Sequence, residues 1–171
     1  SGTALIRNTR LPLLYTPNVH ANSCLTCHFS VVDDDVLVTG GYDGRVIFHD
    51  MRGLSDEPRV SDSRDGSGSL PMRTRIACVV SLLANGPSCH VNHLDMRPDG
   101  RQFAVGSGDS SCYLYTVSTT RIGSKDSIAH VQVDAATPLV LRHGHQDEVM
   151  SVSYSNAGTR LVSSARDCAA V

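Results

Sequence analysis

Short stretches in which apolar and polar residues alternate recur along the chain, and each leads into a cluster of turn-forming residues. One example is Val149–Tyr154 (Val-Met-Ser-Val-Ser-Tyr), which is followed by Asn156-Ala-Gly158. Alternation with a period of two is typical of β-strands, and Asp, Asn and Gly tolerate the backbone bends that connect strands. No long helical periodicity is visible in the sequence. The pattern predicts an all-β chain with frequent turns.

The order of these features repeats in three segments. Each segment has an alternating strand, a turn rich in Asp, Asn or Gly, a second strand with small residues, an Asp at a tight turn, and a third strand. The segments cover residues 23–50, 91–115 and 149–171, and their tight turns contain Asp43, Asp109 and Asp167. The repetition predicts successive copies of one antiparallel unit.

A further apolar run follows an insertion after the third strand of the first two segments. These runs, Arg75–Val80 and Leu139–Leu141, are the predicted fourth strands. The insertions, 51–73 and 116–138, are expected to project from the same face of the fold. The first is rich in Ser, Asp, Gly and Arg and is predicted to be disordered near 53–70, because it cannot bury enough apolar surface to offset its ordering entropy. Its serines could accept phosphate, although an inert loop is favoured.

The repeated order resembles the WD-repeat family of β-propellers. The most specific signature of the family lies in the third segment, where Gly144-His145 precedes the first strand and Asp167 follows at the usual distance for the family. The resemblance implies a partial β-propeller of four-stranded antiparallel blades, with about three blades covered and the ring incomplete. The turn aspartates lie farther apart than the roughly 40–45 residues of a usual blade, and the two insertions account for the excess.

The resemblance also divides the chain into parts. Residues 1–18 are expected to end a preceding blade, with strands around Ala4–Ile6 and Leu11–Tyr15. The remaining parts are one blade at 19–80, a degenerate blade at 81–141 and a truncated blade at 142–171. Open sheet edges pair readily with other strands, so the rest of the propeller is expected from further chain or from another subunit.

A hydrogen-bond network is implied within the more typical blades. In the family it joins a His before the first strand, a Ser or Thr on the second strand, the turn Asp and a Trp on the third strand. The matching residues here are His20, Thr39 and Asp43 in the first blade, and His145, Ser163 and Asp167 in the last. The chain has no Trp, and His49 and Tyr115 stand in its usual place. Pro87 and Val105 replace the His and the Ser of the middle blade, so the network is expected to be missing there.

Charge, hydropathy and cysteine usage bear on location and partners. A net charge of −2 and a pI of about 6.4 argue against nucleic-acid binding through overall charge and against a basic membrane patch. With no signal peptide or membrane span visible, the six cysteines are expected to be free thiols in a reducing, intracellular compartment. Residues 156–167 look similar to late blades of bromodomain-and-WD-repeat proteins, which implies a chromatin-associated parent and favours the nucleus over the cytoplasm.

Two cysteine motifs are candidates for cofactor or metal binding. Cys24-Leu-Thr-Cys27-His28 matches the pattern of covalent haem attachment, but the segment is predicted to be a strand, in which residues three apart point to opposite faces. A core thiol is therefore favoured. Zinc could use Cys24 and Cys27 with Cys89 and His90, but adjacent ligands such as Cys89-His90 suit structural zinc poorly. No cofactor is expected.

Two further motifs are candidates for a metal site and for a nucleophile. His143 and His145, with Asp147 and Glu148, could form a metal cluster, but the family resemblance explains His145 without a metal. The run Gly106–Ser110 lacks the Gly-x-Ser-x-Gly spacing of a nucleophile elbow and is not followed by a predicted helix. We therefore expect no catalytic residue and no metal ligand.

The interpretation that remains is an interaction scaffold for a protein or peptide partner, with no small-molecule substrate. In the WD-repeat family, the residue before each turn Asp often faces partners, and here these residues are Tyr42, Gly108 and Arg166. Tyr and Arg are favoured interface anchors, so Tyr42 and Arg166 are the candidate partner-binding residues. The alternatives are a constitutive structural subunit of a larger complex and a propeller metalloprotein or enzyme.

Overall fold

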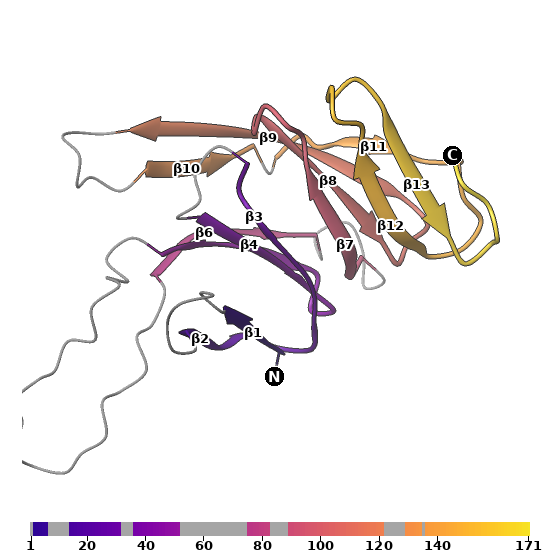
Figure 1. The fold of residues 1–171 in the computed structure, drawn as a ribbon. Coiled ribbons are helices and arrows are strands. Elements are labelled where there is room, and N and C mark those ends of the chain that lie inside the picture. Colours follow the sequence, from indigo (N-terminus) through magenta and orange to yellow (C-terminus); the bar gives the residue numbers. More distant parts are fainter. Residues whose placement is uncertain are drawn as a thin grey trace, which may run out of the picture.

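The computed structural model describes the residues that carry the repeated pattern. The described ranges are 2–6, 14–31, 36–51, 75–82, 89–121, 129–134 and 136–171. Strands and turns make up all the secondary structure in these ranges, and every sheet is antiparallel (Figure 1). The expectation of an all-β chain is therefore confirmed. The expected disorder near 53–70, its candidate phosphate acceptors and Pro87 lie outside the described residues.

The first sheet contains four strands in the order β3-β4-β5-β6. These are β3 (Cys24–Phe29), β4 (Val36–Gly41), β5 (Arg45–Asp50) and β6 (Arg75–Ser81). The run Arg75–Val80 thus forms the fourth strand of this sheet, as predicted. Every residue of β4 is buried, because neighbouring layers cover both faces of the strand, which explains its continuous rather than alternating apolar character.

The second sheet repeats this arrangement with an addition. It contains β7 (Val91–Met96), β8 (Gln102–Ser107) and β9 (Cys112–Arg121), and β11 (Leu139–Leu141) pairs with the first part of β9 as the predicted fourth strand. The insertion expected from 116 to 138 contains strand structure, because β9 continues to Arg121 and returns as β10 (Ala129–Val133). The buried Val117 and Val131 join this extension to the core.

Two shorter sheets flank these. The third sheet contains β12 (Val149–Tyr154) and β13 (Leu161–Ala165), and a hairpin of β1 (Gly2–Ile6) and β2 (Leu14–His20) precedes the first sheet. The first of the two N-terminal strands was expected at Ala4–Ile6, and β1 contains these residues. The second was expected at Leu11–Tyr15, but β2 starts later and continues to His20; residues 11–13 lie outside the described ranges.

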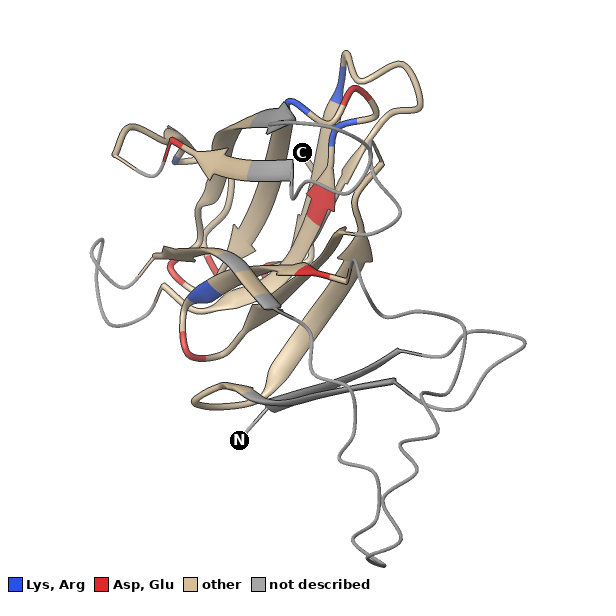
Figure 2. Ribbon diagram, turned by 90° about the vertical axis from the view of Figure 1, so that its left-hand side faces the viewer, with Lys and Arg blue, Asp and Glu red and all other residues tan. Residues whose placement is uncertain are grey.

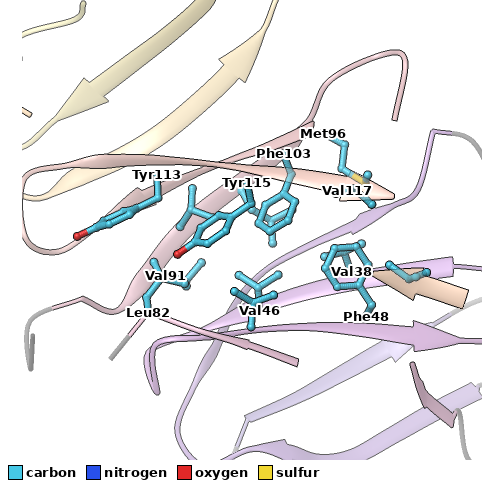
Figure 3. Packing of buried hydrophobic residues seen from close by; sticks show 14 of the residues in the cluster. Val38, Val46, Phe48, Leu82, Val91, Met96, Phe103, Tyr113, Tyr115 and Val117 are labelled. Carbon is cyan, nitrogen blue, oxygen red and sulfur yellow. The ribbon is translucent and has the colours of Figure 1, made fainter. Parts of the chain in front are cut away.

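The main core lies between the first and second sheets (Figure 3). Val38, Val46 and Phe48 project from the first sheet, and Phe103 and Tyr115 from the second, all at most 1% exposed. The rings of Phe48 and Phe103 meet edge to face with centroids 5.6 Å apart, and Phe103 stacks on Tyr115 at 5.1 Å. Such pairs stabilise a core beyond the area that they bury.

Small residues on the second strands let successive sheets approach. A Cβ atom placed on Gly40 would lie 2.5 Å from Cγ1 of Val91, on the first strand of the next sheet. In the same way, a Cβ atom on Gly106 would lie 2.9 Å from Cγ1 of Val149. The two glycines are therefore required by close packing, one between the first and second sheets and one between the second and third.

The first strand of each sheet carries a bulge at the same place. The register shifts between Cys24 and Thr26 in β3, between Val91 and His93 in β7, and between Val149 and Ser151 in β12. The extra residue shifts the alternation of side chains by one position, so Cys24 and Cys27 lie on the same face of β3. The expectation that these two cysteines point to opposite faces is therefore wrong. The repeated bulge is further evidence that the sheets are copies of one unit.

Candidate functional site

The three tight turns have the same geometry. The backbone N–H two residues after each aspartate donates to its Oδ1, at 3.3 Å for Asp43, 3.2 Å for Asp109 and 3.0 Å for Asp167. The residue after each aspartate has a left-handed backbone, with φ of 69° at Gly44, 66° at Ser110 and 66° at Cys168. Asp favours such turns because its side chain closes them locally. The turns place the residues before the aspartates at equivalent points of the three sheets.

In the first sheet, His20 lies within hydrogen-bond distance of both Thr39 and Asp43. Nδ1 of His20 lies 2.9 Å from Oδ1 of Asp43, and its Nε2 lies 2.8 Å from the Thr39 hydroxyl. The same hydroxyl lies 2.9 Å from Nε2 of His49, the residue that stands where the family has Trp. One consistent arrangement has His49 donating to Thr39, Thr39 donating to His20, and His20 donating to Asp43.

The environment of His49 favours its neutral form. Burial, with the neighbouring His20 as a second cause, lowers the pKa of His49 to about 4. A neutral imidazole can carry a proton on Nε2 and donate it to the Thr39 hydroxyl, as an indole N–H would. His49 can thus give Thr39 the hydrogen bond that the indole of a Trp would give.

In the third sheet, His145, Ser163 and Asp167 are brought together in the same way. Nδ1 of His145 lies 3.2 Å from Oδ2 of Asp167, and its Nε2 lies 2.8 Å from the Ser163 hydroxyl. The backbone N–H of Gln146 also donates to Asp167 over 2.8 Å. Hydrogen bonds from the backbones of Gln146 and Ala169, followed by the contact with His145, lower the pKa of Asp167. The carboxylate is therefore held in its ionised form.

The second sheet holds its turn aspartate with different residues. The Tyr113 hydroxyl donates to Oδ2 of Asp109 over 2.5 Å, and the Cys89 thiol donates to the same oxygen over 3.3 Å. The family network was expected to be missing here, and its His and Ser positions are indeed changed, but a Cys–Asp–Tyr network replaces it. Sequence reasoning missed it because neither Cys89 nor Tyr113 stands at a position of the family pattern.

A row of side chains crosses the three sheets beside these turns. The backbone N–H groups of Gly108 and Arg166 donate to the carbonyls of His90 and Glu148, respectively, just as Tyr42 donates to Ser23. His90 and Glu148 therefore occupy equivalent positions ahead of the first strands. We call Tyr42, His90, Glu148 and Arg166 the turn row.

Side chains of the turn row touch from one sheet to the next. The Tyr42 ring stacks on the His90 ring with centroids 4.2 Å apart and planes 22° apart. Nε2 of His90 lies 3.9 Å from Oε2 of Glu148, which lies 3.6 Å from Nη1 of Arg166. Tyr42 is 50% exposed and the Arg166 side chain 61% exposed. Both residues selected from the sequence are accessible, and His90 and Glu148 connect them.

Charged residues elsewhere lie mainly at turns and strand ends, with both signs interspersed (Figure 2). Within the described ranges, no three His, Cys, Asp or Glu residues are grouped so as to hold a metal ion. All six cysteines are free, and burial raises the pKa of four of them, to about 11 for Cys24. Protonated thiols are weak nucleophiles and weak metal ligands. A helix that could cross a membrane does not occur among the described residues.

Comparison with known proteins places this geometry in context. A family model described as "WD domain, G-beta repeat" matches residues 77–116 and 137–170. Two relatives, each described as "Ribosome biogenesis protein WDR12 homolog", come from Drosophila persimilis and Drosophila pseudoobscura pseudoobscura. Each is 24% identical over 135 residues, which is 75% of this chain and 32% of the relative.

The solved structures include a similar fold. The crystal structure of RRP9 WD40 repeats aligns with a TM-score of 0.58 and 15% identity, covering 97% of this chain and 36% of that chain. The expectation of a partial propeller of antiparallel sheets is thereby confirmed. The chain spans about a third of the length of each of these relatives.

Proposed function

We propose that this chain, which belongs to the WD-repeat family, is an interaction scaffold that binds a protein or peptide partner through the turn row. The observation that carries the proposal is the continuity of Tyr42, His90, Glu148 and Arg166 across three sheets. Aromatic and Arg side chains that are accessible and held in place are favoured anchors of protein interfaces. Binding rather than catalysis is the role that this surface supports.

The buried networks favour binding by holding the turns in one conformation. We propose this structural role for His20, Thr39 and Asp43 in the first sheet, and for His145, Ser163 and Asp167 in the third. Each network ties the segment before a first strand to the turn that carries Tyr42 or Arg166. A surface that is ordered before binding loses less conformational entropy when the partner arrives.

We also propose that a further sheet covers the free face of the third sheet. Val162 is 50% exposed, whereas the residues at the equivalent position of the second strands, Val38 and Ala104, are fully buried by the next sheet. An apolar strand residue exposed at a position that is otherwise buried favours a partner sheet, supplied by further chain or by another subunit.

The parent protein is proposed to be an intracellular, nuclear component of a larger complex. The support comes from the two relatives, whose description refers to ribosome biogenesis. The resemblance of residues 156–167 to bromodomain-and-WD-repeat proteins points to a chromatin-associated parent, also in the nucleus. The same relatives and the exposed Val162 favour a constitutive structural subunit as the second candidate function.

The test is a comparison of protein complexes formed by matched double variants. Tyr42→Ala combined with Arg166→Ala should reduce partner recovery at least tenfold in quantitative affinity purification, with an unchanged melting temperature. Thr159→Ala combined with Arg160→Ala alters exposed residues at the other end of β13 and should change neither value. Equal partner recovery with both variants would remove the turn row as the binding surface. A partner that resists exchange by added free protein would favour the structural subunit.

A further inference from the structure

We infer that the turn row receives a carboxylate of an acidic peptide, and that Glu148 occupies the place of that carboxylate until the peptide binds. The inference rests on the proposed function, because it names the chemistry of the segment that the scaffold would bind. It adds an exchange of partners: the incoming carboxylate pairs with Arg166, and Glu148 turns to His90.

Glu148 is shared between Arg166 and His90 and is weakly held by both. Its Oε2 lies 3.6 Å from Nη1 of Arg166 and 3.9 Å from Nε2 of His90, and neither distance is that of a hydrogen bond. The side chains of Arg166 and Glu148 are 61% and 30% exposed. Ion pairs this accessible contribute little stability, so a ligand carboxylate that meets the guanidinium with two parallel hydrogen bonds can replace Glu148.

His90 is positioned to accept the displaced Glu148. The His90 side chain is only 9% exposed, and its Nε2 has no hydrogen-bond partner among the described residues. The Tyr42 ring stacks on one side, and Gly108 leaves room on the other, where a Cβ atom would overlap the imidazole. The ring is thus fixed with Nε2 near Glu148. His90 is a positioning residue, since it acts on the ligand through Glu148.

The charged groups around the turn row bear on which ligand it accepts. The other charged groups on the turns around this point are Asp43, Asp109, Asp147, Asp167 and Arg142. Asp43, Asp109 and Asp167 are already engaged in the buried networks.

The exposure of the row favours an acidic partner over a basic one. Arg166 is the most exposed charged member of the row, with 61% of its side chain exposed against 30% for Glu148, so the positive charge is the more accessible of the two. The half-exposed Tyr42 ring offers an apolar surface next to this cation. A peptide in which an apolar side chain accompanies a Glu or Asp would match both.

Fluorescence polarisation with labelled hexaglutamate and hexalysine peptides tests the inference on the purified chain. Hexaglutamate should bind, and hexalysine should bind much more weakly. Arg166→Gln should weaken hexaglutamate binding about tenfold. Glu148→Gln should strengthen it, because the variant lacks the carboxylate that competes for Arg166. Arg160→Gln, the same charge change at the other end of β13, should leave the affinity unchanged.

Several outcomes would overturn the inference. Hexalysine binding more tightly than hexaglutamate, no hexaglutamate binding, or weaker binding by Glu148→Gln would each contradict it. Equal losses of hexaglutamate affinity in Arg166→Gln and Arg160→Gln would indicate general charge attraction instead of a specific binding site. The proposed function fails separately, if the Tyr42 and Arg166 double variant retains all its protein partners. Amide NMR spectra of each variant, compared with the unaltered chain, establish that the fold is retained.

Discussion

The Tyr113 hydroxyl donates a hydrogen bond to the Asp109 carboxylate over 2.5 Å, at the turn of the sheet that lacks the family network. Burial, followed by this hydrogen bond, raises the pKa of Tyr113, so the phenol remains protonated and remains a donor. The carboxylate that a His holds in the first and third sheets is thus held by a Tyr and a Cys in the second. The turn geometry has been kept while its supporting residues have changed.

Removing this hydroxyl tests the replacement network. Tyr113→Phe should lower the free energy of unfolding by roughly 1.5–3 kcal/mol, because it removes a hydrogen bond to a charged, partly buried group. Tyr42→Phe is the control, since that ring is half exposed, and it should change the value by no more than about 0.5 kcal/mol. Urea unfolding at neutral pH measures both. Equal stability of the two variants would mean that Asp109 does not depend on Tyr113.

The lowered pKa of His49 predicts how stability changes with pH. An unfolded histidine takes up a proton near pH 6.5, whereas His49 in the fold does so only near pH 4. The unfolded state therefore binds more protons in between, and stability should fall by roughly 3 kcal/mol as pH decreases from 6.5 to 4. His49→Gln keeps an N–H donor without titrating, so it should lose less stability over this range. Urea unfolding at several pH values gives the comparison, and parallel curves would contradict the assignment.

A methyl group at Gly108 should disturb the turn row. In Gly108→Ala the new Cβ atom would overlap the His90 imidazole, so the ring must move away from Tyr42. The expected loss of stability is about 1–3 kcal/mol, as for other overpacked sites. Gly144→Ala is the matched control, because the nearest atom to its Cβ would be 3.7 Å away, on Val171. Thermal unfolding should separate the two variants; two equal melting temperatures would argue against this placement of His90.

The residue after each turn aspartate has a left-handed backbone, so removing a glycine there and introducing one should change stability in opposite directions. Gly44→Ala should destabilise the first sheet by roughly 1–2 kcal/mol, because φ is 69° there and a Cβ atom disfavours that conformation. Ser110→Gly, at the equivalent turn with φ of 66°, should raise stability by up to about 1 kcal/mol. Both changes are measurable by denaturant unfolding. Effects of the same sign would show that the backbone conformation of the turns is not the cause.

Much of the fold follows from local patterns in the sequence. The spacing of the turn aspartates, the alternation in strands such as β12 and the apolar run that forms β6 predicted the order and type of the elements. The resemblance to the WD-repeat family also grouped His20 with Asp43 and His145 with Asp167, which the structure brings within 2.9 Å and 3.2 Å. These relationships are visible because they recur at fixed distances along the chain.

The remaining features depend on contacts that have no fixed spacing. The bulge after Cys24 is a property of pairing with β4, so simple alternation assigned Cys27 to the wrong face. Cys89 and Tyr113 meet Asp109 only because the strands are packed, and neither residue type predicts that role alone. The stack of Tyr42 on His90 joins two sheets, so it could not be found by examining one repeat at a time.

The most direct test of the central claim is site-specific photo-crosslinking from the turn row in native extract. A benzophenone amino acid at position 42 should give discrete adducts with a partner protein, and excess Tyr42→Ala, Arg166→Ala double variant should not compete for it. The same probe at position 160, exposed at the other end of β13, should give none. The turn row is identified as the binding surface if excess native chain without the probe prevents the adducts at position 42 and excess double variant does not. Adducts only at position 160, or equal competition by both chains, would contradict the claim.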